Sequence, residues 1–267
     1  MKVDLRDIPR IGIESENETE LNLISTDLIH SKLAFKLING VNPDIRIELG
    51  SNFQIDLEAR TIVLPHTSYG RSELNYFLRV ALDSVAVVNG VLPLHGGAVY
   101  SKDQSLFLFG FSKDGKSTMV KALGDRTGYA PIGDDHLLVG KDRVVGNSQL
   151  RIRLADDLTE KFEPVETTER ALRDYSILWV QLSSQDNYTR HTVSEFLGRE
   201  ERVNEVLKYI LKPVTVNGCL YTIDDLTGVD IEARGRELFK RFIGQSRQIN
   251  TIQGNIHQIL RRTMEQK

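Results

Sequence analysis

The sequence is poor in several features that mark whole classes of protein. Its 267 residues include one cysteine, Cys219, so neither an internal disulfide nor a cysteine-based metal cluster can form. We expect Cys219 to be a small buried apolar residue. No apolar run approaches a membrane span, and the N-terminal segment MKVDLRDIPRIG lacks the apolar core of a signal peptide. The sequence therefore predicts a soluble, cytoplasmic protein that has no membrane partner.

Positive charge is not in excess either. The formal net charge is -3, whereas general nucleic-acid binders concentrate positive charge to displace counterions from phosphates. We therefore expect no nucleic-acid partner. Apolar residues make up 40% and charged residues 27% of the chain, as in ordinary globular proteins. The length suffices for one large domain or for two modest ones.

Residues 1–90 predict a small β-rich module that ends in a helix. Turn residues separate short segments in which apolar and polar residues alternate, and 17–19 is expected to be loop. The predicted strands are 44–49, 52–57 and 60–64.

The helix that ends this module has Ser72 as its predicted N-cap and Gly90 at its C-terminal end. Its apolar residues from Leu74 to Val85 fall on one face at helical spacing. We assign this stripe to core packing and give the helix no other role.

Residues 91–267 predict a second domain, in which apolar strands and helices both occur. The predicted strands are 91–94, 98–100, 105–109, 137–139, 150–154 and 177–182. The predicted helices run from 116 to about 124, and over 203–211, 232–243 and 255–264.

The segment GFSKDGKS, from Gly110 to Ser117, fits the phosphate-loop pattern G-x-x-x-x-G-K-[ST]. It follows an apolar strand and opens a helix, as this loop requires. In such a loop the backbone N–H groups surround a polyphosphate, and the helix N-terminus faces the same anion. Lys116 would contact the β- and γ-phosphates, and the Ser117 hydroxyl would ligate Mg²⁺. A chance match in a turn-rich segment is the alternative.

A pair of carboxylates, Asp134 and Asp135, lies between short apolar segments in PIGDDHLLV. Adjacent residues on a strand point to opposite faces, so the two carboxylates would differ in role. One would hold Mg²⁺, and the other would accept a proton from an attacking hydroxyl. Gly-Asp-Asp is also good turn chemistry, so an ordinary acidic turn is the alternative. His136 adjoins the pair and would support it.

Two further sites are candidates. His95 precedes two glycines at a strand junction in LPLHGGAV, which suggests an imidazole that faces a cavity; a histidine satisfied within a bend is the alternative. Arg151 and Arg153 alternate on a predicted strand, so both face one side and could meet phosphate or an acidic substrate. A solvated strand face is the alternative there.

The segments LHGGAVY, FLFGFSKDGKSTM and GDDHLLV, in this order, resemble the catalytic domain of the bacterial HPr kinase/phosphorylase and the wider group of HPr-kinase-like proteins. That group shares a phosphate-loop fold with the nucleotide-dependent phosphoenolpyruvate carboxykinases. The resemblance covers about His95 to Val139. It implies a mixed, β-rich α/β core, ATP with Mg²⁺, and phosphoryl transfer to a hydroxyl, typically of serine.

Carried over by position, the resemblance implies Asp135 as the base, Asp134 and Ser117 on the metal side, Lys116 on the phosphates, and His95 beside the phosphates and the carboxylate. It also implies a set of residues that hold the nucleotide: Gly110, Phe111, Ser112, Lys113, Asp114, Gly115, Lys116, Ser117 and Thr118.

The remainder of the chain departs from the authentic HPr kinase. Residues 1–90 do not look like its N-terminal domain, and VVGNSQLRIRL stands where its HPr-gripping loop would follow. We therefore expect a kinase whose acceptor is a hydroxyl of a protein, a peptide or a small molecule. A nucleotide-binding regulatory module without an acceptor is the alternative, and a carboxykinase-like enzyme is a third interpretation that the short chain disfavours. By analogy with HPr-kinase relatives, which are often oligomeric, self-association is expected.

Overall fold

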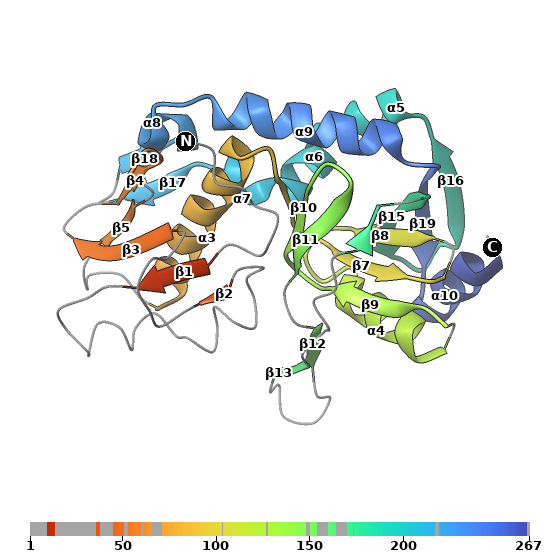
Figure 1. The fold of residues 1–267 in the computed structure, drawn as a ribbon. Helices are drawn as coiled ribbons and strands as arrows, with labels where there is room; N and C mark the ends of the chain where they lie inside the picture. The colour runs from red at the N-terminus through yellow and green to blue at the C-terminus, as the bar shows by residue number, and fades with distance from the viewer. Residues whose placement is uncertain are drawn as a thin grey trace.

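The protein has a mixed α/β fold in a computed structural model, in which helices pack on several sheets (Figure 1). The predicted loop at 17–19 lies outside the residues that the structure describes. Described are residues 10–13, 36–37, 45–50, 53–59, 61–65, 71–102, 104–126, 128–147, 150–153, 160–163, 170–172, 174–216 and 219–265.

The largest sheet has six strands in the order β16-β19-β15-β8-β7-β9. Its centre is parallel, because β15 runs parallel to both β8 and β19, whereas the remaining pairs are antiparallel. The whole of β8 is buried, which explains the unbroken apolar run LFLF that follows Ser105. The strand bounds are β7 Gly97–Tyr100, β8 Ser105–Phe109, β9 Ala130–Gly133, β15 Tyr175–Leu182, β16 Asn187–His191 and β19 Ile249–Gly254.

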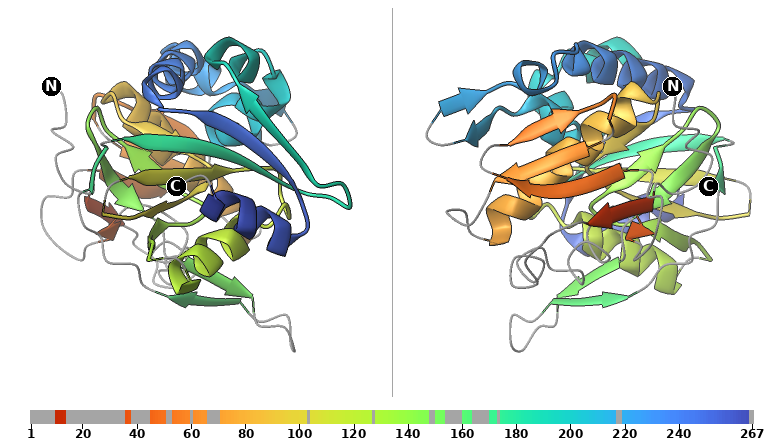
Figure 2. Two further views of the ribbon diagram at one scale, coloured as in Figure 1. Left: turned by 90° about the vertical axis from the view of Figure 1, so that its right-hand side faces the viewer. Right: turned by 60° about the vertical axis from the view of Figure 1, so that its left-hand side comes forward.

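Helices cover both faces of this sheet. On one face, α4 (Lys116–Arg126) and α10 (Ile256–Glu265) pack against alternate residues such as Leu106 and Leu108. On the other face, α9 (Ile231–Gln245) packs against Phe107 and its neighbours. The two views in Figure 2 show α4 and α9 on opposite sides of the strands. The period-two alternation of a strand therefore divides the apolar core between the two helical layers.

A second, four-stranded sheet has the order β14-β11-β10-β6 and is antiparallel throughout. The chain passes between the two sheets from β6 into β7, from β9 into β10 and from β14 into β15. The first two crossings are neighbours, because β7 pairs with β9 in the large sheet and β6 pairs with β10 in the small one. The bounds are β6 Leu92–Leu94, β10 Leu137–Val139, β11 Arg143–Asn147 and β14 Arg170–Ala171.

The N-terminal region forms a five-stranded sheet, β2-β1-β3-β5-β4, followed by α3 (Arg71–Val88). Helix α3 packs on β5, β6, α7 and α9, and one continuous apolar core includes residues from both sides of residue 90. The division into 1–90 and 91–267 remains a prediction. The strand bounds here are β1 Arg10–Ile13, β2 Lys36–Leu37, β3 Ile45–Gly50, β4 Gln54–Asp56 and β5 Thr61–Pro65.

The remaining elements are short. Two hairpins, β12–β13 and β17–β18, stand apart from the larger sheets. Their bounds are β12 Leu150–Arg153, β13 Glu160–Glu163, β17 Val214–Val216 and β18 Cys219–Tyr221, and the short helices are α5 Val193–Leu197, α6 Glu200–Val206, α7 Lys208–Leu211 and α8 Ile223–Thr227.

Most predicted elements are confirmed, and β8 and β10 have their predicted bounds. The predicted helix over 203–211 is two helices, α6 and α7, which meet at Leu207. Helix α3 begins at Arg71, so Ser72 lies inside it and is not its N-cap. Gly90 follows α3 with a φ of 78°, as a C-terminal glycine should.

Two further predictions are wrong. Cys219 is exposed on β18 rather than buried, because that strand belongs to a hairpin that no other strand of the described chain pairs with. Asp134 and Asp135 lie in a bend between β9 and β10 rather than on a strand, so strand alternation does not separate them. Across the described ranges, no helix combines the length and the apolar content that crossing a bilayer requires.

The core makes a direct prediction about stability. Phe107 is fully buried, and its ring packs edge-on against Tyr175 and Phe242 at centroid distances of 5.5 and 4.9 Å. We expect Phe107→Ala to lower the free energy of unfolding by about 3–5 kcal/mol, because it leaves a cavity. Leu220→Ala, at a side chain that is 68% exposed, should change it by less than about 0.5 kcal/mol. Urea unfolding measures both, and equal losses would contradict this core.

Candidate active site

The segment from Gly110 to Gly115 is a tightly turned loop that joins β8 to α4. The Asp114 amide donates to the Phe111 carbonyl at 3.2 Å, and the Phe111 amide donates to Asp114 Oδ2 at 3.0 Å. Lys113 and Gly115 have φ values of 72° and 84°, a left-handed conformation that recurs in anion-binding loops. At Gly110, a Cβ atom would lie 2.5 Å from the Val180 carbonyl oxygen, so only glycine fits there.

Lys116 spans this loop from the first turn of α4. Its Nζ donates to the carbonyls of Gly110 at 2.8 Å and Phe111 at 2.9 Å, and the side chain is buried. Burial lowers the pKa of Lys116, and the negative charges of Glu205, Asp135, Asp134 and Asp114 oppose that shift. Lys116 is thus held at the loop, and the charges of Asp134 and Asp135 act on it.

The predicted nucleotide-binding residues lie together around this loop. Phe111, Ser112, Lys113 and Thr118 are exposed, whereas Asp114, Gly115 and Ser117 are half-buried. An accessible, turned loop at a helix N-terminus can receive an anion.

His95 and Asp135 lie in the two neighbouring crossings between the sheets. Ala98 pairs with Gly133 on one side of the crossings, and Leu94 pairs with Leu137 on the other. Residues between two such pairs must approach each other, and His95 Nε2 lies 3.1 Å from Asp135 Oδ1. Two sequence motifs forty residues apart are therefore brought together by strand pairing.

Asp135 is held on both its side chain and its backbone. Arg79 donates from Nη1 to Asp135 Oδ2 at 3.0 Å and from Nη2 to the Asp135 carbonyl at 2.9 Å. Burial alone would raise the pKa of Asp135, but the hydrogen bond with His95 and the charges of Arg79, His95 and Lys208 hold it well below its usual range. Asp135 is therefore an ionised carboxylate at neutral pH.

Helix α3 supplies Arg79, a residue that the sequence analysis missed when it gave that helix only a packing role. Its guanidinium is buried and lies over the Tyr209 ring at 3.7 Å. Burial and the Arg79 charge act in opposite directions on the pKa of Tyr209, and burial prevails, raising it to about 12. A usable signal was present, because Arg79 and Asp83 interrupt a helical segment, YFLRVALDSVAVV, that is apolar on nearly every side.

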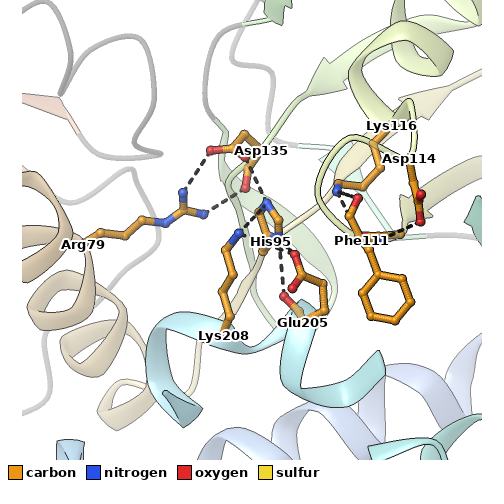
Figure 3. Close-up of polar contacts among 9 residues, drawn as sticks. Arg79, His95, Phe111, Asp114, Lys116, Asp135, Glu205 and Lys208 are labelled. Atoms are coloured by element: carbon orange, nitrogen blue, oxygen red, sulfur yellow. Dashed lines mark hydrogen bonds and ion pairs between the residues drawn. The ribbon is translucent and has the colours of Figure 1, made fainter. Parts of the chain in front are cut away.

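Glu205 and Lys208 were missed as well, and both contact His95 (Figure 3). Glu205 Oε1 lies 3.2 Å from His95 Nδ1, and Lys208 Nζ lies 3.1 Å from His95 Nε2. Burial lowers the pKa of Lys208 to about 8 despite the charges of Glu205 and Asp135. A neutral His95 cannot donate to Asp135 and accept from Lys208 through the same nitrogen, so its tautomer selects one of the two.

Asp134 and His136 flank Asp135 and are both buried. His136 Nε2 lies 2.8 Å from Asp83 Oδ1, so His136 supports the bend through α3, consistent with its predicted supporting role. Asp134 acts on Lys116 through its charge and lies close to Gly97. Within the described ranges, no group of three His, Cys, Asp or Glu side chains is arranged to hold a metal ion.

Arg151 and Arg153 lie on β12, which pairs with β13 and packs beside α4, the helix that follows the phosphate loop. Their possible contact with phosphate or substrate remains a prediction. A hollow of about 200 Å³ lies between the end of α3 and α9. Asn89, Arg234 and Arg241 are among the residues that line it, and none of the three belongs to the candidate site.

Comparison of the chain with known protein families and with curated proteins yields no match. The site must therefore be interpreted from its own geometry.

The position of Glu205 predicts a pH dependence of stability. Burial would raise the pKa of Glu205, but the hydrogen bond with His95 and the charge of Lys208 lower it to about 2, against 4.5 for a free side chain. A carboxylate with a depressed pKa stabilises the fold above pH 4.5, and this contribution is lost as the pH falls from about 4.5 to 2. We expect Glu205→Gln to lower the free energy of unfolding by roughly 1–3 kcal/mol at pH 7 and by clearly less near pH 3.

Urea unfolding at several pH values measures this difference. Glu237→Gln is the matched control, because Glu237 is 73% exposed and pairs with Arg241, one turn further along α9. A Glu205→Gln effect that does not change with pH would contradict the ion pairing described here.

Proposed function

We propose that the chain is an ATP-dependent kinase that transfers the γ-phosphoryl group to a hydroxyl of a protein, a peptide or a small molecule. One observation carries the proposal: the Asp135 carboxylate, fixed by Arg79 and His95, lies in the same site as a turned glycine-rich loop that is spanned by Lys116 (Figure 3). Phosphoryl transfer requires this pairing, because the enzyme must hold a polyphosphate and orient an incoming hydroxyl at once.

The loop would bind the donor. Its amides and the N-terminus of α4 would surround the phosphates, with Lys116 placed to neutralise charge that develops on the phosphoryl oxygens. The exposed loop residues and the half-buried Ser117 leave this surface accessible. The carbonyl contacts of Lys116 hold its Nζ across the loop, so little reorganisation is needed on binding.

Asp135 would receive the acceptor. The acceptor oxygen attacks the γ-phosphorus, the bond from that phosphorus to the ADP oxygen breaks, and the hydroxyl proton passes to Asp135. A low pKa makes Asp135 a weak base, but in a loose transition state orientation of the nucleophile matters more than basicity. His95 would orient the carboxylate through Nε2 when that nitrogen carries the proton.

The residues also fit Mg²⁺. The hydroxyl of Ser117 and the carboxylate of Asp134 are oxygen ligands of the kind that Mg²⁺ prefers, and this ion takes few protein ligands when phosphates supply the others. When bound, the ion would neutralise phosphate charge.

The fold supports membership of the HPr-kinase-like group as part of this proposal. The core mixes parallel and antiparallel strands, and the phosphate loop follows a central strand. The histidine and aspartate motifs meet in adjacent crossings, as a shared catalytic site requires. Use of ATP favours a cytoplasmic location, and self-association remains an expectation from analogy.

If Asp135 is the base, its replacement should reduce turnover without a comparable loss of ATP binding. With γ-labelled ATP, Mg²⁺ and candidate acceptors, we expect Asp135→Asn to lower kcat at least about 100-fold, because the amide cannot take the proton. The affinity for ATP should change by less than about threefold, because Asp135 is not part of the loop. Asp142→Asn, at a carboxylate that is 75% exposed, is the control.

The outcomes separate the candidate functions. A regulatory module without an acceptor would bind ATP, release ADP at a rate no acceptor changes, and tolerate Asp135→Asn. Wild-type protein that labels no acceptor and shows no acceptor-stimulated ADP release would overturn the kinase proposal. Lys116→Ala should abolish ATP binding in either case and so confirms that the loop is the nucleotide site.

The lowered pKa of Lys208 predicts that activity falls at high pH. Its pKa of about 8 means that its charge is present below pH 8 and is lost as the pH rises through that value. If this charge supports transfer, kcat/KM, which reports groups of the free enzyme, should fall above about pH 8. Lys208→Arg should move the fall to higher pH, because arginine keeps its charge. An identical pH profile for the two proteins would exclude Lys208 from the chemistry.

A further inference from the structure

Helix α3 contacts two consecutive residues, Asp135 and His136, of the bend that carries the proposed base. Arg79 and Asp83 are four residues apart and therefore lie on one face of the helix. Arg79 binds Asp135, and Asp83 pairs with His136 at 2.8 Å. Both helix residues are buried, with 4% and 2% of their surfaces exposed. The helix comes from the region that precedes the phosphate loop, so it forms no part of the segment from His95 to Val139.

The bend itself needs such support. Asp135 has a φ of 69°, a left-handed conformation that costs a non-glycine residue roughly 1–2 kcal/mol. Arg79 contacts both the carboxylate and the carbonyl of this one residue, so it fixes the backbone and the side chain together. The Tyr209 ring beneath the guanidinium in turn limits where Arg79 can move.

Fold stability alone gives a poor reason for this arrangement. Replacing a buried ion pair by apolar side chains of similar volume is often neutral or stabilising, because desolvation of the charges offsets their attraction. The residues next to Arg79 and Asp83 along α3 are apolar, and Leu78, Val80 and Leu82 are fully buried. Burial of the Arg79 guanidinium costs free energy of desolvation, so its presence here indicates a role that an apolar side chain could not fill.

We infer that Arg79 is a positioning residue of the kinase reaction: its two-point contact from α3 holds the Asp135 carboxylate in the orientation that receives the acceptor hydroxyl. The inference rests on the proposed function and deepens it, because it makes the region before residue 90 a working part of the catalytic unit. Arg79 is buried against the Tyr209 ring, so we expect it to act through Asp135 and to touch neither nucleotide nor acceptor.

This role predicts a separation between binding and turnover. Arg79→Gln removes the charge and the fork of donors, and misplacement of a base by about 1 Å can cost on the order of 100-fold in rate. We therefore expect kcat to fall about 100-fold, while the affinity for ATP changes by less than about threefold. Arg79→Lys keeps the charge but cannot reproduce two parallel donors, so its kcat should lie between wild type and Arg79→Gln.

Chemical rescue distinguishes positioning from a general loss of structure. In Arg79→Ala, millimolar guanidinium should restore part of the lost kcat by occupying the vacated place beneath Asp135, whereas ammonium should restore less. Damaged folding would not recover, because guanidinium weakens folded proteins. Thermal unfolding of each variant, with Arg241→Ala as control at a 54% exposed arginine, checks that the proteins are folded.

The outcomes are separable from those of the proposed function. Wild type that transfers no phosphoryl group overturns the kinase proposal and this inference with it. If wild type is active and Asp135→Asn is not, an Arg79→Gln protein with normal kcat overturns this inference alone. It is also overturned if Arg79→Lys is no better than Arg79→Gln and guanidinium restores nothing, because Arg79 would then serve the fold only. Should Arg79→Ala fail to fold, the Lys and Gln variants still decide the matter.

Discussion

Strand pairing on either side of two chain crossings determines which side chains meet at the candidate site. Because β7 pairs with β9 and β6 pairs with β10, the residues between those pairs are adjacent however far apart they are in sequence. His95 comes from one crossing and Asp135 from the other, and the turned loop from Gly110 to Gly115 follows the strand next to β7. A slip in either pairing would separate the histidine from the carboxylate.

Around this junction the protein concentrates charge in a largely buried place. Arg79, Lys116 and Lys208 face Asp134, Asp135 and Glu205 with no more than partial access to water. Each charge is tolerable because a neighbour of opposite sign offsets its desolvation. Such clusters of perturbed groups are typical of functional sites, where the environment adapts side chains to a task. This group of buried charges therefore distinguishes the region from the apolar core around it.

The sequence predicted what depends on local pattern and missed what depends on distance. The strand, the turned loop and the helix around residues 110–117 follow from a contiguous motif, and a long apolar stripe identified α3. Asp134 and Asp135 were assigned to a strand, whereas the turn chemistry of Gly-Asp-Asp decided their conformation. Arg79 could not be placed, since its partner Asp135 is 56 residues away, and Lys208 is 113 residues from His95. Sequence spacing carries no signal for contacts that only sheet topology creates.

A crystal structure of the protein with Mg²⁺ and a non-hydrolysable ATP analogue would reveal how the loop and Asp135 lie around a bound nucleotide. We expect the triphosphate in the loop from Gly110 to Ser117, with a carboxylate oxygen of Asp135 within hydrogen-bond reach of the point opposite the leaving oxygen on the γ-phosphorus. A nucleotide bound elsewhere would overturn the kinase proposal. So would a γ-phosphate in the loop that faces away from Asp135.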